Sequence, residues 1–308
     1  MPDISVQLAP KHKAGLLLAN PIMPASGTFG YGIEWEGLLD VQKLGAVVCK
    51  GTTLKPRDGN SQPRLIETSS GLLNSIGLQN IGIEAVIKEK APVWSKWKVP
   101  VIVNIAGETI DEYAKVAAKL NGIPGIAGIE LNISCPNVDC GGMEFGIEPD
   151  TSAAVTKTVK SNTDFPVIVK LSPNVTDITE IALAVADAGA DAITLINTLR
   201  GMAIDINKEK PSLGNVIGGL SGRAIKPIAL YMVYRVAGMV KVPIIGCGGI
   251  ANTEDALEFI MAGASAVQIG TSGMADPSLF LKVLNGIELY LESKNIKSLK
   301  EIVGIAHK

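Results

Sequence analysis

Residues 166–174 read PVIVKLSPN, a short run of Val and Ile that ends in a lysine, a serine and a turn. The same pattern returns at residues 100–105 (PVIVNI) and 242–247 (VPIIGC). None of these runs alternates strictly between apolar and polar residues, which is typical of strands buried on both faces of a parallel sheet. A unit that recurs in this way predicts a fold built from repeated strand–helix pairs.

Eight such runs occur along the chain, and helical patterns separate several of them. The predicted strands lie within residues 21–27, 45–51, 100–107, 128–134, 166–174, 191–198, 243–249 and 265–271. The predicted helices include residues 109–120, 177–189, 223–239 and 253–263. A length of 308 residues suits one closed (β/α)₈ barrel of about 250 residues with additions. We therefore expect a single TIM barrel domain over residues 1–308, with an open, doubly wound parallel sheet as the structural alternative.

The amino-acid composition argues against several classes of protein. Hydrophobic residues make up 47% of the chain and charged residues 19%, which excludes a disordered protein. The net charge of −2 gives no electrostatic footprint for nucleic acid or an anionic membrane. Four cysteines without a CxxC pair predict reduced thiols and a cytoplasmic protein. The only histidines, His12 and His307, lie near the chain ends, which argues against a histidine-based zinc site.

Two long connections interrupt the strand–helix alternation. Residues 52–82 follow the second predicted strand, and residues 201–222 follow the sixth. Connections from a strand to the next helix lie at the carboxyl-terminal face of a barrel, where active sites are built. Loops of this length in a compact domain are usually functional, so we expect both to border the site.

The strand ends that face this site are rich in amides and contain two lysines but no carboxylate. Glycosidases need a pair of carboxylates, and divalent metals prefer oxygen anions, so we predict neither chemistry and no metal. Gly248-Gly249 and Gly270-Thr271 end the last two strands and predict a phosphate site, because glycine lets backbone N–H groups close on oxygens. The segment 246–251 also matches a dinucleotide fingerprint, but no acidic residue stands at the next strand end.

Lys170 ends the fifth predicted strand, and Lys50 ends the second. A lysine inside a barrel is costly to bury unless it meets an anion or a developing negative charge. Lys170 is therefore a candidate either for a Schiff-base lysine or for a cation beside a reduced flavin. The structural alternative is a lysine whose ammonium group reaches solvent.

Cys135 lies just past the fourth predicted strand, where a thiol can act as a nucleophile or a general base. Cys140 lies in the same loop and is interpreted as a bystander. Cys49 and Cys247 lie within strands and are expected to be small buried side chains.

Several segments together resemble the dihydroorotate dehydrogenase family. They are, in order, ANPIMPASGTFGYG (19–32), NSIGLQNIG (74–82), ELNISCPNV (130–138), PVIVKLSPN (166–174), LINT (195–198) and IIGCGGI (244–250). The resemblance covers nearly the whole chain and points to the cytosolic branch, whose members are FMN barrels. The LQN of residues 78–80 and the DCGGMEFG of residues 139–146 are similar to the NAD-linked subgroup.

The resemblance implies a role for each matching residue. Cys135 would take the proton from carbon 5 of dihydroorotate, while the hydride from carbon 6 goes to flavin N5. The FMN contacts implied are Ser26, Lys50, Gly51, Asn104, Asn132, Lys170, Ile196, Gly222, Gly248, Gly249, Gly270 and Thr271. The substrate contacts implied are Lys50, Asn74, Ser75, Ile76, Gly77, Leu78, Asn132, Asn197 and Thr198.

The resemblance also implies a partner. In the NAD-linked subgroup a second polypeptide carries FAD and a 2Fe-2S cluster, and two copies of each chain form a heterotetramer. This sequence has no cluster-like cysteine spacing of its own. Three alternatives stay open: a homodimer that passes electrons to fumarate, a non-redox lyase that uses Lys170, and a catalytically silent scaffold.

The loop that contains Cys135 also carries Gly141, Gly142 and Gly146, which could serve as hinges. We therefore expect this loop to act as a lid over the site.

Overall fold

The computed structural model describes residues 1–134, 136–137 and 143–308. Eight parallel strands form one sheet in the order β3-β18-β17-β12-β11-β8-β7-β4. They are β3 (Ile22–Pro24), β4 (Val47–Val48), β7 (Val101–Ile105), β8 (Gly128–Asn132), β11 (Val167–Lys170), β12 (Ala192–Leu195), β17 (Ile244–Cys247) and β18 (Ala264–Ile269). The amide of Gly45, just before β4, donates to the carbonyl of Ile22 in β3 at 2.8 Å. This bond joins the two ends of the sheet, so the predicted barrel is confirmed and the open sheet is excluded.

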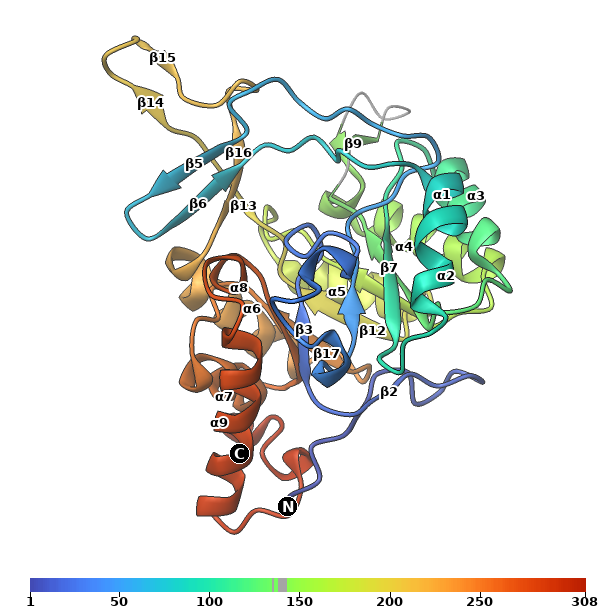
Figure 1. Ribbon diagram of the computed structural model, residues 1–308, viewed down its shortest axis with the longest axis vertical. Coiled ribbons are helices and arrows are strands. Elements are labelled where there is room, and N and C mark those ends of the chain that lie inside the picture. The colour runs from blue at the N-terminus through green and yellow to red at the C-terminus, as the bar shows by residue number, and fades with distance from the viewer. Residues whose placement is uncertain (135, 138–142) are drawn as a thin grey trace.

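Helices surround the barrel and connect its strands (Figure 1). They are α1 (Ile83–Ala85), a π-helical turn (Val86–Lys90), α2 (Ala91–Trp94), α3 (Ile110–Leu120), α4 (Pro149–Asn162), α5 (Ile178–Asp187), α6 (Lys226–Ala237), α7 (Thr253–Met261), α8 (Thr271–Ala275) and α9 (Leu279–Ser293). The side chains of Thr109, Asp177 and Asn252 accept backbone N–H bonds at the starts of α3, α5 and α7. These caps satisfy amides that a helix start leaves free, which fixes where each helix begins after its strand.

The amino-terminal end of the barrel is covered by a short hairpin. Its strands are β1 (Val6–Gln7) and β2 (Leu17–Leu18), which pair antiparallel. Leu8, Leu16 and Leu18 are buried, and Leu16 packs near Gly128 at the start of β8. Both chain termini lie together at this end of the molecule (Figure 1). This end of the barrel is therefore a packed core, and the opposite end remains for a site.

The two long connections pair with each other at the carboxyl-terminal face. They contribute β5 (Leu65–Thr68), β6 (Gly71–Asn74), β13 (Leu199–Gly201) and β16 (Gly218–Ser221), which form a four-stranded antiparallel sheet in the order β13-β16-β6-β5. The sequence predicted the position of both connections but not this sheet.

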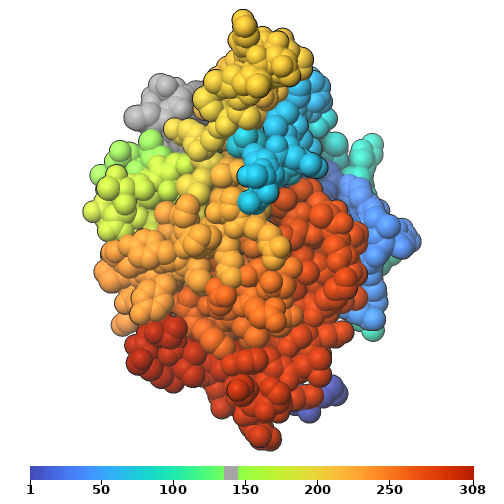
Figure 2. All heavy atoms as spheres, turned by 90° about the vertical axis from the view of Figure 1, so that its left-hand side faces the viewer, coloured from blue at the N-terminus to red at the C-terminus, as the bar shows by residue number. Residues whose placement is uncertain are grey.

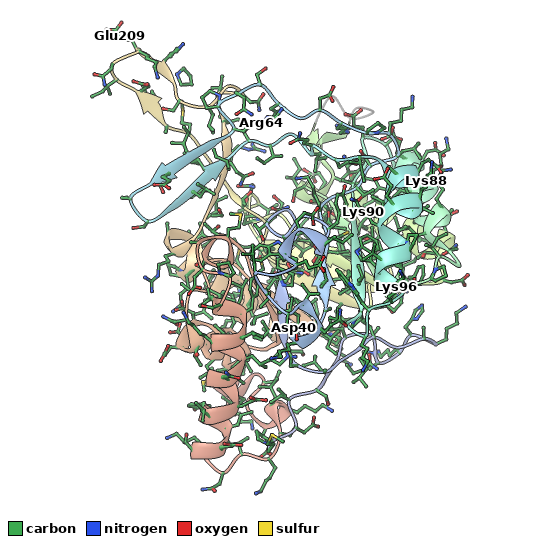
Figure 3. All side chains as sticks on the ribbon, in the orientation of Figure 1. Asp40, Arg64, Lys88, Lys90, Lys96 and Glu209 are labelled. Atoms are coloured by element: carbon green, nitrogen blue, oxygen red, sulfur yellow. The ribbon has the colours of Figure 1, made fainter. Side chains whose placement is uncertain are left out.

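A two-stranded arm extends beyond that sheet. It consists of β14 (Ile204–Asp205) and β15 (Lys210–Pro211), and it projects from the body of the molecule (Figures 1 and 2). Glu209 lies at its tip (Figure 3). The side chains of Ile204 and Ile206 are exposed on the arm. A further antiparallel pair, β9 (Pro136–Asn137) with β10 (Met143–Glu144), lies beyond the end of β8.

Candidate active site

A cavity of about 500 Å³ opens at the carboxyl-terminal face of the barrel. Such a volume falls within the range of about 300–1,000 Å³ that is usual for small-molecule and cofactor sites. Every site residue expected from the sequence, apart from Cys135, lines this one cavity: Ser26, Lys50, Gly51, Asn74, Ser75, Ile76, Gly77, Leu78, Asn104, Asn132, Lys170, Ile196, Asn197, Thr198, Gly222, Gly248, Gly249, Gly270 and Thr271. The fold thus brings together residues that are nearly 250 positions apart in the chain.

Lys170 forms part of the closed, inner end of the cavity. Its ammonium group donates to Gln268 Oε1 at 3.1 Å and lies 3.4 Å from Ser26 Oγ. The side chain is only 4% exposed, so the lysine does not reach solvent. Burial opposes its charge, but attraction to the Cys247 sulfur and the Glu130 carboxylate outweighs burial and raises the pKa of Lys170. The site therefore contains a fixed, buried cation.

Glu130 is a buried carboxylate that the sequence reasoning did not select. It lies in the middle of β8 and is fully buried inside the barrel. Asn104 Nδ2 donates to it at 2.8 Å, Gln268 Nε2 at 2.6 Å and Thr194 Oγ1 at 3.1 Å. The signal was a charged residue within an apolar strand, two positions before Asn132 and so on the same face.

Glycines shape another side of the cavity. A Cβ on Gly249 would lie 2.7 Å from the Cβ of Lys226 and 2.9 Å from the carbonyl oxygen of Gly222, and its φ is +77°. The left-handed backbone and the lack of space both require glycine at this position. Lys226 itself binds Asp255 and donates to Glu258 at 2.9 Å, which holds the start of α6 against the start of α7. Gly222, Gly248 and Gly249 therefore line this side of the cavity with backbone atoms alone.

A cluster of amides lies where β8 and β12 end. Asn197 Nδ2 donates to Asn132 Oδ1 at 3.2 Å and to Ser134 Oγ at 3.0 Å, and its own Oδ1 accepts from the Thr198 amide at 2.8 Å. Tyr113 Oη donates to the carbonyl of Asn132 at 2.6 Å. These bonds fix the orientation of each amide, so that Asn132 presents its NH₂ group as the donor end.

The antiparallel sheet supplies the facing side of the cavity. Asn74 in β6 pairs with Gly219 in β16, and Asn74 Nδ2 donates to the carbonyl of Gly219 at 3.1 Å. A Cβ on Gly219 would lie 2.0 Å from Thr198 Oγ1. Gly219 thus binds Asn74 on one side and lies close to Thr198 on the other. It thereby couples the loop of residues 74–78 to Asn197 and Thr198, although the sequence separates them by more than 100 positions.

Arg64 stabilises the loop that carries residues 74–78. Its guanidinium donates to the carbonyl of Asp58 at 2.9 Å and to Gln79 Oε1 at 3.0 Å, and its side chain also binds the carbonyl of Asn60. Arg64 directly precedes β5 and lies next to the antiparallel sheet, above the barrel in the view of Figure 3. The sequence reasoning missed this residue, because its role depends on a loop conformation that no motif records.

Lys50 lies at the cavity wall and is only partly buried. Burial lowers its pKa, the carboxylate of Glu34 opposes this effect, and the charge of Arg64 adds to it. Lys50 therefore differs from Lys170, whose pKa is raised. An anionic ligand in the cavity would favour the charged form of Lys50.

The four cysteines fall into two groups. Cys135 and Cys140 lie outside the described residues, as does most of the loop proposed as a lid. Cys49 and Cys247 are buried, as expected from their strand positions, and burial raises the pKa of the Cys49 thiol to about 12. Within the described ranges, no cluster of three or more acidic, histidine or cysteine side chains is arranged to hold a metal ion. Over the same residues, no helix is both long and apolar enough to cross a bilayer.

Comparison with known proteins identifies the family to which this barrel and cavity belong. The sequence model described as dihydroorotate dehydrogenase matches residues 10–291. The chain belongs to the dihydroorotate dehydrogenase family. This finding confirms the resemblance that the motifs suggested.

Individual members of the dihydroorotate dehydrogenase family are similar over almost their full length. A protein from Geobacter sp. (strain M21) is 54% identical over 303 residues, 98% of each chain. One from Desulforudis audaxviator (strain MP104C) is 54% identical over 295 residues, 96% of each chain. One from Desulforamulus reducens is 56% identical over 290 residues, 94% of this chain and 95% of the relative. Each is named "Dihydroorotate dehydrogenase B (NAD(+)), catalytic subunit".

Proposed function

We propose that this chain is the FMN-binding catalytic subunit of an NAD-linked dihydroorotate dehydrogenase, which oxidises dihydroorotate to orotate in the cytoplasm for pyrimidine biosynthesis. The observation that carries the proposal is the buried Lys170 cation at the inner end of a cavity whose walls are amides and glycines. A single domain over residues 1–308 would hold both the flavin and the substrate.

The cavity fits FMN by its chemistry. Gly222, Gly248 and Gly249 line the cavity and carry no side chain, which suits a phosphate group held by backbone N–H groups. Lys170 supplies a fixed positive charge, which would stabilise a flavin that gains negative charge on reduction. Ser26, Gly51, Asn104, Asn132, Ile196, Gly270 and Thr271 would complete the contacts. When bound, FMN would accept the hydride from carbon 6 of the substrate.

The amides would bind the pyrimidine ring and its carboxylate. Asn132 offers an NH₂ donor, and Asn74 offers a carbonyl oxygen because its NH₂ already binds Gly219. A ring that carries both N–H and C=O groups needs such a mixture of donors and acceptors. Lys50 would meet the substrate carboxylate, and Ser75, Ile76, Gly77, Leu78, Asn197 and Thr198 would enclose the ring.

Cys135 would act as the base that removes the proton from carbon 5. Ser134, which directly precedes it in the chain, and Asn132, three positions before it, both line the cavity. The thiol would need only to accept this proton, because the hydride leaves separately from carbon 6. The proposed base therefore belongs to the segment that leads out of β8.

A partner subunit that carries FAD and a 2Fe-2S cluster would pass the electrons to NAD⁺ within a heterotetramer. The matched relatives are each named as a catalytic subunit, which supports the presence of a separate partner subunit. The lyase alternative is disfavoured because the matched relatives are named as dehydrogenases.

An absorption spectrum tests the proposal directly. We expect the purified protein to be yellow, to release FMN on denaturation, and to lose its flavin band when dihydroorotate is added without oxygen. A colourless protein that traps a substrate under borohydride would support the lyase instead. Rapid turnover of the isolated chain with fumarate would support the homodimeric alternative.

A further inference from the structure

The buried network beneath the cavity joins five side chains from five different strands. Glu130 (β8) accepts from Asn104 (β7), Thr194 (β12) and Gln268 (β18), and Gln268 in turn accepts from Lys170 (β11). All five are at least 96% buried. Asn104 and Lys170 line the cavity, whereas Glu130, Thr194 and Gln268 lie behind them.

The directions of these hydrogen bonds are set by Glu130. Its Oε1 accepts from the amide of Asn104, and its Oε2 accepts from the amide of Gln268 and the hydroxyl of Thr194. Because Gln268 must turn its NH₂ toward Glu130, its carbonyl oxygen is left to accept from the Lys170 ammonium. In the same way, the NH₂ of Asn104 points to Glu130, and its Oδ1 is directed toward Gly51 at the cavity wall.

We propose that Glu130 is the positioning residue of this site: it fixes the amide orientations of Asn104 and Gln268, and through Gln268 it holds the Lys170 ammonium in the cavity. The inference rests on the proposed flavin site and goes beyond it, because it assigns a function to a residue that does not line the cavity. A wrongly turned Gln268 would present an NH₂ group to an ammonium group, and neither can accept from the other.

The substitution Glu130→Gln tests this inference. The new NH₂ group at position 130 would face the NH₂ of either Gln268 or Asn104, so one of these two amides must turn. Where Gln268 turns, Lys170 loses its acceptor. We expect roughly tenfold weaker FMN binding to the apoprotein, the size typical of one charge-assisted hydrogen bond. We also expect a more negative flavin reduction potential, because the nearby cation is displaced or loses its proton.

The double substitution Glu130→Gln with Gln268→Glu provides the matched rescue. It exchanges donor and acceptor between β8 and β18, keeps one carboxylate in the network, and again offers Lys170 an oxygen. We expect FMN affinity and potential to return most of the way to the wild-type values. A second control, Glu112→Gln, removes a carboxylate that binds the amide of Glu108 instead of this network and should change neither quantity.

The measurements are FMN binding by fluorescence quenching and the flavin potential against reference dyes, with thermal melting to compare folding. An unchanged potential in Glu130→Gln, a more positive one, or no rescue in the double variant would overturn the inference. Failure of the proposed function is distinguishable, because it would appear as a wild-type protein that binds no flavin or is not reduced by dihydroorotate.

Discussion

Lys170 shows how a single buried charge can be tolerated in a barrel interior. It is nearly inaccessible to water, yet its ammonium group binds Gln268, and the opposite charge of Glu130 lies beyond that amide. Removing one partner of such an arrangement leaves the other charge buried without compensation, which is far more costly than breaking a solvated pair. The two charges should therefore depend on each other for stability.

We expect Lys170→Met to lower the free energy of unfolding of the apoprotein by about 3–5 kcal/mol, measured by urea denaturation. The double variant Lys170→Met with Glu130→Gln should recover part of this loss, because it removes the stranded carboxylate. Lys13→Met, which breaks the solvent-exposed pair with Asp164, is the control and should have little effect. Equal losses in the Lys170 and Lys13 variants would contradict this account.

A second prediction at the residue scale concerns the proposed base. Cys135→Ala should still bind FMN and orotate but reduce flavin with dihydroorotate about 10²–10⁴ times more slowly near neutral pH. Cys135→Ser should recover some rate at high pH, since a hydroxyl is the poorer base at neutrality. Stopped-flow reduction measures both effects, and Cys140→Ala serves as the control. A near wild-type rate in Cys135→Ala would remove this cysteine from the mechanism.

At the scale of elements, the pairing of β6 with β16 matters most for the proposed substrate side of the cavity. We expect Gly219→Ala to weaken orotate binding by about tenfold or more while FMN content stays the same, because the added Cβ would collide with Thr198 Oγ1. Gly201→Ala in the same sheet is the matched control, as its nearest neighbour is the flexible end of Leu73 at 3.1 Å. Titration of orotate against the flavin spectrum measures the two affinities. Similar affinities in both variants would mean that the Thr198 contact is unimportant.

The sequence predicted the barrel and most of the cavity because both depend on local signals. Val- and Ile-rich runs mark the strands, and the residue after each run, such as Lys170 or Gly248, must lie at the same face of the barrel. The β6–β16 pairing was out of reach, since it joins segments about 145 positions apart that lack alternating patterns. Glu130 was missed because its partners come from three other strands, and only the closed ring brings them together.

At the scale of the whole molecule, the cavity of about 500 Å³ would have to serve a reaction with two half-steps. If orotate occupies one side of the flavin within the barrel mouth, little room remains for a nicotinamide at the same flavin. We therefore expect the isolated chain to reduce an artificial dye with dihydroorotate but to use NAD⁺ poorly. Addition of a subunit with FAD and a 2Fe-2S cluster should raise NAD⁺ reduction by orders of magnitude, measured as NADH absorbance. Efficient NAD⁺ reduction by the isolated chain would contradict the need for a partner.

The order of strands around the ring has a consequence for synthesis of the protein. β18 lies between β17 and β3, so the last barrel strand to leave the ribosome is the one that connects the late part of the chain to its beginning. A nascent chain that stops before residue 264 has no strand to fill this place, and β3 and β17 keep unpaired edges. Such edges are prone to association with other chains, so they must be protected until translation is nearly complete. Gln268 is also in β18, and its amide links the buried charges of Lys170 and Glu130. This link can therefore form only after β18 has been synthesised.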